Sequence, residues 1–209
     1  MNFVDAEGGK RRAELDAASL FPFEEKILAS GRCGAVLPAV ILTVGAVRLV
    51  RYDTTGFLRF CEYPFRHLDQ VLGVLYDVPR VILEAEDRLL SANKFALGGD
   101  TLFVNAKNLM PGLLYGAGET EGAGFCAGYA ALLALSRTWD HITGLPEAVR
   151  GVEERIRLEN PDIRNLLRIV ETVRREWNLI HPALFRFGRE QPVQHGGGFG
   201  AGGAAGRVE

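Results

Sequence analysis

A stripe of apolar residues near the C-terminal end constrains the fold more than any other feature of the sequence. Its members follow one another at intervals of three or four residues: Ile163, Leu166, Val170, Val173, Trp177 and Ile180. This spacing places them on one face of an α-helix, as at the a and d positions of a heptad repeat. The sequence therefore predicts a long helix with one narrow contact face. That face packs either on a helix of the same chain or on another subunit.

The segment before this helix is also predicted to be helical. Pro146 suits the first turn of a helix that runs to about residue 158. One face of that helix is apolar and consists of Leu145, Val149, Val152 and Ile156. Asn160 is then expected to cap the long helix, with Pro161 in its first turn, and Pro182 is expected to end it. The C-terminal half is thus predicted to be helical.

The N-terminal half favours strands and short helices. Residues 13–29 predict two short helical pieces separated near Pro22, because proline breaks a helix interior. Residues 35–52 are rich in valine, isoleucine and leucine, which predicts one or two buried strands. Residues 53–56, Asp-Thr-Thr-Gly, have the signature of a type I turn. We therefore expect a hairpin between Val44–Tyr52 and Phe57–Tyr63.

The following region is harder to assign. Apolar residues at helical spacing predict a short helix over residues 64–77, whereas residues 80–85 resemble a strand. Residues 84–97 fit either a helix or a strand. Glycines at 98 and 99 predict a turn, and residues 101–104 a short strand.

A glycine-rich loop joins the two halves and leads into an apolar helix expected over residues 122–138. Its glycines resemble phosphate-binding patterns, in which backbone N–H groups and a helix N-terminus face an anion. The candidate ligand contacts are Gly116, Gly118, Glu119, Glu121, Gly122, Gly124, Cys126 and Tyr129. Residues 111–115 make a poor preceding strand, and no Gly-Lys-Ser/Thr follows. The alternative is that Gly124 and Gly128 let this helix pack closely against another part of the backbone.

The sequence offers no arrangement typical of catalysis or metal binding. It contains no HExxH, CxxC or GxSxG pattern, so no catalytic residue, metal ligand or cofactor is predicted. The three cysteines, Cys33, Cys61 and Cys126, are far apart and fit buried free thiols in a reducing compartment.

Composition gives no indication of a nucleic-acid or membrane partner. The net charge of −2 gives no overall attraction to nucleic acid or to an anionic membrane. Uncharged runs at 33–47 and 122–136 are fifteen residues each, too short to cross a bilayer. The N-terminus lacks the apolar segment of a signal peptide, so we expect an intracellular (cytoplasmic) protein or part of a particle assembled there.

These observations predict an α+β protein with a mainly antiparallel N-terminal sheet and a helical C-terminal half. The expected divisions are an N-terminal helical segment (1–30), one α+β domain (31–190) and a glycine-rich flexible tail (191–209). We expect a non-enzymatic structural or assembly protein, such as a virion component, that forms homo-oligomers or binds other subunits through helix–helix contacts. The alternative is an enzyme that binds a small ligand or nucleotide at the loop between Gly116 and Gly128.

Overall fold

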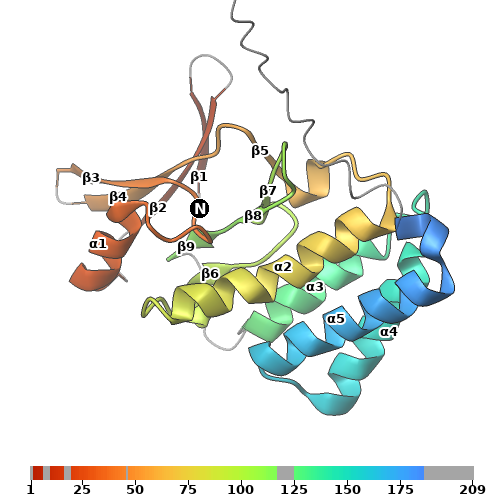
Figure 1. Ribbon diagram of the computed structural model, residues 1–209. Helices are drawn as coiled ribbons and strands as arrows, with labels where there is room; N and C mark the ends of the chain where they lie inside the picture. Colours follow the sequence, from red (N-terminus) through yellow and green to blue (C-terminus); the bar gives the residue numbers. More distant parts are fainter. Residues whose placement is uncertain (1, 7–9, 17–19, 46, 117–124, 186–209) are drawn as a thin grey trace, which may run out of the picture.

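The computed structural model describes residues 2–6, 10–16, 20–45, 47–116 and 125–185. It confirms the α+β class, since strands occupy most of one side of the molecule and helices the other (Figure 1). One hydrophobic core runs through both parts, from Tyr52 in the sheet to Val170 in the last long helix.

The largest sheet has four antiparallel strands in the order β1-β2-β4-β3. Their bounds are β1 Asn2–Ala6, β2 Lys10–Asp16, β3 Ala39–Val44 and β4 Val47–Asp53. Residues 13–16 were expected to be helical, but they pair with β4 as part of β2. Only the second of the two expected helical pieces forms, as α1 (Pro22–Ser30).

The expected hairpin partner of β4 is wrong. β4 pairs with β3 across a tight turn in which Val44 lies opposite Val47 and Gly45 has a φ of +61°. A positive φ at the first position of a tight hairpin turn is adopted by glycine without strain. After β4 the chain turns over residues 54–57, where the Phe57 amide bonds to the Thr54 carbonyl at 3.0 Å. The turn thus starts one residue later than expected.

The strand after this turn, β5 (Phe57–Arg59), leaves β4 and pairs with β7 (Phe103–Asn105). β7 in turn pairs with β8 (Pro111–Gly112), and β6 (Phe95–Ala96) pairs with β9 (Leu114–Tyr115). Two single-turn helices, η1 (Phe60–Glu62) and η2 (Ala92–Lys94), lie in the connections. These short pieces join the sheet to the helices.

The longest helix, α2 (Leu68–Glu86), replaces both the short helix and the strand expected over residues 64–85. Its apolar residues recur at helical spacing and are buried on one face: Val71, Leu72, Leu75, Val78 and Ile82. The helix continues through Pro79, beyond the end at residue 77 that was expected for the short helix. Residues 87–97 therefore begin after this helix and contain η2 and β6.

The C-terminal half is helical, as predicted. It consists of α3 (Phe125–Ser136), α4 (Leu145–Glu159), α5 (Ile163–Ile180) and the single turn η3 (Pro182–Phe185). The cap of α5 is Asp162, not Asn160, because the Asp162 carboxylate accepts a 2.7 Å hydrogen bond from the Asn165 amide. Asn160 instead ends α4 with a φ of +42°.

Candidate functional site

The structure describes three of the eight residues proposed as ligand contacts in and after the glycine-rich loop. Gly118, Glu119, Glu121, Gly122 and Gly124 lie outside the described residues, so their role stays a prediction. The other three candidates are described, and they differ in exposure. Gly116 follows β9 with a φ of +93°, Cys126 is exposed near the start of α3, and Tyr129 is completely buried.

Tyr129 belongs to the core. Its hydroxyl donates a 2.8 Å hydrogen bond to the carbonyl oxygen of Leu75 in α2. Burial raises the pKa of this phenol, which therefore stays protonated. Its side chain is part of the contact between α3 and α2.

Gly128 fits the packing alternative. A β-carbon built at this position would lie 2.6 Å from the Leu97 β-carbon and 3.0 Å from the Leu97 carbonyl oxygen. A side chain here would push α3 away from the chain at residue 97. The glycine thus allows a close helix-to-backbone contact.

The cysteines are not all buried. Cys33 is buried, whereas Cys61 and Cys126 are exposed. Burial of the thiol, followed by the nearby Glu62 carboxylate, raises the pKa of Cys61 above its usual range. A raised pKa reduces the thiolate fraction and hence nucleophilicity at neutral pH.

A buried polar cluster lies where α1, η2 and β9 meet. The Glu24 carboxylate accepts hydrogen bonds from the Tyr115 hydroxyl at 2.6 Å and from the Lys94 ammonium at 2.9 and 3.1 Å. It also accepts one from the Phe21 amide at 2.8 Å, and the Lys94 ammonium lies 4.5 Å from the centre of the Phe21 ring. Sequence reasoning missed this cluster because its members are up to 91 residues apart.

The electrostatics of the cluster favour a structural role. Burial raises the pKa of Glu24, but the hydrogen bonds from Tyr115, Lys94 and the Phe21 amide outweigh it and leave the pKa below its usual value. Burial and the bond to Glu24 raise the pKa of Tyr115. The carboxylate is ionised, paired and only 2% exposed, so the cluster ties α1 to η2 and β9.

The predicted stripe on α5 packs largely inside the chain. Leu166, Val170 and Val173 are buried, and α5 contacts both α2 and α4. Ile163 and Trp177 are partly buried against the same core. Only Ile180 stays open, with 70% of its surface exposed. The central part of the stripe is therefore already covered, while contacts between subunits stay a prediction.

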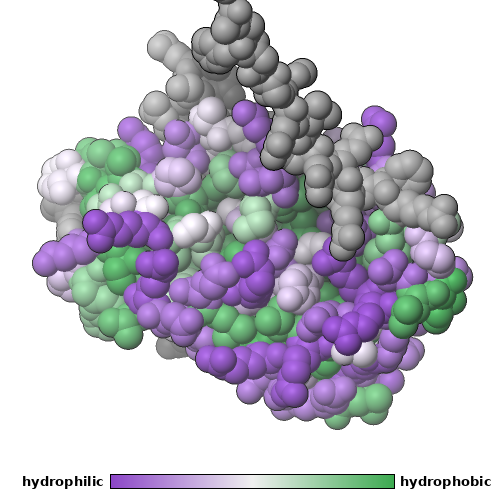
Figure 2. All heavy atoms as spheres, viewed as in Figure 1, coloured by the Kyte–Doolittle hydropathy of each residue, from purple (hydrophilic) through white to green (hydrophobic). Residues whose placement is uncertain are grey.

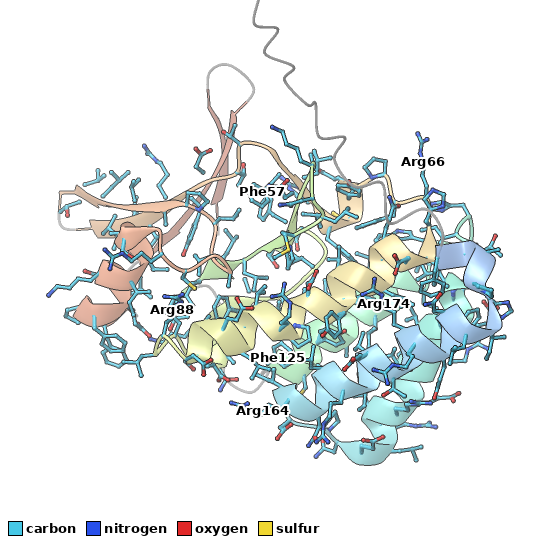
Figure 3. All side chains as sticks on the ribbon, viewed as in Figure 1. Phe57, Arg66, Arg88, Phe125, Arg164 and Arg174 are labelled. Atoms are coloured by element: carbon cyan, nitrogen blue, oxygen red, sulfur yellow. The ribbon has the colours of Figure 1, made fainter. Side chains whose placement is uncertain are left out.

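A polar hollow of about 560 Å³ lies beside this seam, lined by Asp69, Glu171, Arg174, Arg175, Asn178, Pro182 and Phe185. Arg174 reaches from α5 toward α2 (Figure 3) and donates to the Asp69 carboxylate at 2.6 and 2.9 Å. Arg175 pairs with Glu171 at 3.0 Å. Both arginines of the hollow already bind carboxylates within it, and the pair between Arg174 and Asp69 joins α5 to α2.

Metal and membrane sites find no structural support. Among the residues that the structure describes, no group of three or more His, Cys, Asp or Glu side chains is placed to hold a metal ion. In the same part of the chain, no helix has both the length and the apolar character needed to cross a membrane.

The open edge of the four-stranded sheet, strand β3, is the strongest candidate for a functional surface. Its sequence, Ala39-Val-Ile-Leu-Thr-Val44, has no charge and no proline. Natural sheets usually protect an edge with charges, prolines or a covering segment, because unpaired backbone groups invite another strand. The opposite edge strand, β1, contains Asp5. The edge at β3 lacks a charge of this kind.

The hydrogen-bond pattern shows which groups of β3 point outward. The Asp53 amide bonds to the Pro38 carbonyl, and Val44 closes the hairpin opposite Val47, so even-numbered residues bond to β4. The backbone N–H and C=O groups of the odd-numbered residues point away from β4. Upstream of β3, Ala35 and Leu37 use this outward edge to bond to Leu113.

Ala39, Ile41 and Thr43 also point their backbone groups to this outward side. Among the described residues, the backbone N–H and C=O groups of these three residues bond to nothing. The segment that bonds to residues 35 and 37 through Leu113 does not continue the pairing at Tyr115. The Tyr115 amide donates to the Tyr52 hydroxyl at 3.2 Å, and the Tyr115 carbonyl accepts from the same hydroxyl at 2.5 Å.

Exposed apolar side chains accompany this edge. Val40 and Val44 of β3 are 54% and 61% exposed, and Phe21 and Phe23 at the start of α1 are 57% and 45% exposed. Figure 2 shows hydrophobic residues gathered at this end of the molecule, on the left of the view, where β3 and α1 lie. We call the six residues Ala39–Val44, with their outward backbone groups, the β3 edge.

Comparison with known proteins adds no family: no protein-family model matches the sequence, and no curated protein is significantly similar to it.

Proposed function

We propose that this protein is a non-enzymatic, self-associating component of a larger protein assembly, and that the β3 edge is its contact surface. The observation that carries the proposal is the uncharged strand whose outward backbone groups at Ala39, Ile41 and Thr43 bond to no other described residue. A second strand supplies hydrogen bonds to these groups and covers the exposed valines beside them. The proposed contact is therefore a strand edge rather than the helix–helix contact first expected.

A second copy of the chain suits this edge better than a charged partner. The edge carries no charge, so two copies meet without repulsion and without burying an unpaired ion. An interface limited to six residues per chain is smaller than those of permanent dimers. We therefore expect reversible association that depends on protein concentration.

Thr43→Pro tests this proposal without removing a bond to β4. The Thr43 amide points outward, so proline deletes a donor that only an added strand would use. Thr43→Val is the matched control, because it keeps the amide and a β-branched side chain. Sedimentation velocity over a wide concentration range measures both variants and the wild type, with circular dichroism to check folding.

We expect wild type and Thr43→Val to associate alike, and Thr43→Pro to raise the dissociation constant by about tenfold or more, as the loss of two backbone hydrogen bonds implies. Equal association of the proline variant would show that another surface is used. A wild-type chain that stays monomeric at every concentration would overturn the proposed function.

A further inference from the structure

The geometry points to one arrangement of the pair: two β3 edges run antiparallel, with Ile41 of each chain opposite Ile41 of the other on a two-fold axis. This inference rests on the proposed function and specifies its partner and register. A two-fold contact uses the same surface on both chains, as the neutral β3 edge allows.

The register follows from which groups are unpaired. Antiparallel strands bond through pairs of outward-facing residues, so an odd-numbered residue must face an odd-numbered one. Placing Ile41 opposite itself also puts Ala39 opposite Thr43 of the second chain. All outward groups at positions 39, 41 and 43 are then paired in both copies.

Shifting one chain by two residues loses some of these bonds. In one direction Thr43 would face Leu37, whose amide already bonds to Leu113 at 3.1 Å. In the other direction Ala39 would face Gly45, which sits in the hairpin turn with a φ of +61°. Of these three registers, the central one alone pairs all the outward groups that lack a partner in the described part of the chain.

This register also sets the side-chain contacts on the solvent side of the sheet. Val40 lies opposite Leu42 of the second chain, at a position that does not exchange hydrogen bonds. Such directly opposite residues have Cα atoms about 4.5 Å apart, within reach of a disulfide, whereas diagonal neighbours are about 7–8 Å apart. The exposed Val40 becomes covered by a leucine.

Cysteine cross-linking of mixed chains tests the register. The background carries Cys61→Ser and Cys126→Ser, which remove the two exposed thiols. V40C and L42C are made separately in this background, then oxidised mildly alone and as an equal mixture. Non-reducing gels and mass spectrometry identify the products, and sedimentation under reducing conditions shows whether each variant still associates.

We expect the mixture to give at least about ten times more cross-linked dimer than either variant alone, through a bond between the V40C and L42C chains. Efficient cross-linking of V40C alone, or of L42C alone, would reveal a register shifted by two residues and overturn this inference. Association without cross-linking in any sample would also overturn it. In these cases self-association itself stands, whereas a monomeric wild type would overturn the proposed function.

Discussion

The hydroxyl of Tyr129 occupies the place of a missing backbone donor opposite the carbonyl oxygen of Leu75. In a regular helix that carbonyl accepts from the amide four residues later. Here that residue is Pro79, which has no amide hydrogen, and Tyr129 donates instead at 2.8 Å. The bond explains how α2 continues through a proline, and it fixes α3 against α2.

We predict that Tyr129→Phe lowers the free energy of unfolding by about 1–3 kcal/mol, because the buried Leu75 carbonyl loses its partner. In a Pro79→Ala background the alanine amide can bond to that carbonyl, so the same change should cost less. Urea unfolding of the four chains in this double-mutant cycle measures the coupling. If Tyr129→Phe lowered the free energy of unfolding equally in both backgrounds, the Tyr129 hydroxyl would not be the replacement for the missing amide at residue 79.

A second prediction concerns acid stability. The pKa of Glu24 is lowered in the folded protein, so the unfolded chain binds protons more readily. The stabilisation is complete well above the ordinary carboxyl pKa of about 4.3, and it is lost as the pH falls through the lower, folded value. Glu24→Gln should therefore flatten the decline of stability at acid pH.

At pH 7, Glu24→Gln should cost about 3 kcal/mol, because it removes the buried carboxylate that accepts from both Lys94 and Tyr115. Glu84→Gln is the control. Its side chain is 56% exposed and pairs with Arg80, so it should change stability by less than about 1 kcal/mol. Urea unfolding at several pH values measures both variants, and an unchanged pH profile for Glu24→Gln would contradict the prediction.

The α5 stripe gives a third prediction. Leu166 is 1% exposed and Ile180 is 70% exposed. Leu166→Ala should destabilise the chain by about 2–5 kcal/mol, whereas Ile180→Ala should change stability by less than about 0.5 kcal/mol. Thermal unfolding measures both. A marked loss of association in the well-folded Ile180→Ala variant would instead indicate that α5 forms a contact between subunits.

A fourth prediction concerns two helical glycines, whose replacement by alanine should change stability in opposite directions. A β-carbon at Gly128 would lie 2.6 Å from that of Leu97, so Gly128→Ala should destabilise by about 1–3 kcal/mol. At Gly73 in α2 the nearest atom is an Arg174 nitrogen at 3.9 Å. Gly73→Ala should therefore stabilise by up to about 1 kcal/mol, through helix propensity alone. Chemical unfolding of both variants tests the contrast.

Sequence reasoning succeeded where a local pattern decides the structure. The helices over residues 145–159 and 163–180 form where amphipathic spacing and turn residues predict them. It was wrong where distant contacts decide. The helix expected over residues 64–77 continues through Pro79, where Tyr129 supplies the missing donor. Likewise, β4 pairs with β2 and β3 rather than with the segment after it.

The candidate site was harder to predict than the helices. From its sequence, the uncharged run at residues 33–47 predicts only a buried core element. What makes it a candidate surface is its position at the sheet edge and the diversion of Tyr115 toward Tyr52. Neither can be inferred from spacing, because both depend on which strands pair.

Amide hydrogen exchange at the β3 edge is the most direct measurement of the central claim. Ala39, Ile41 and Thr43 should exchange rapidly in dilute protein and become protected as the concentration rises, because an added strand then bonds to them. Val40, Leu42 and Val44, which bond to β4, should be protected throughout and serve as the internal reference. Exchange at the three outward amides that stays fast while the protein associates would contradict the account.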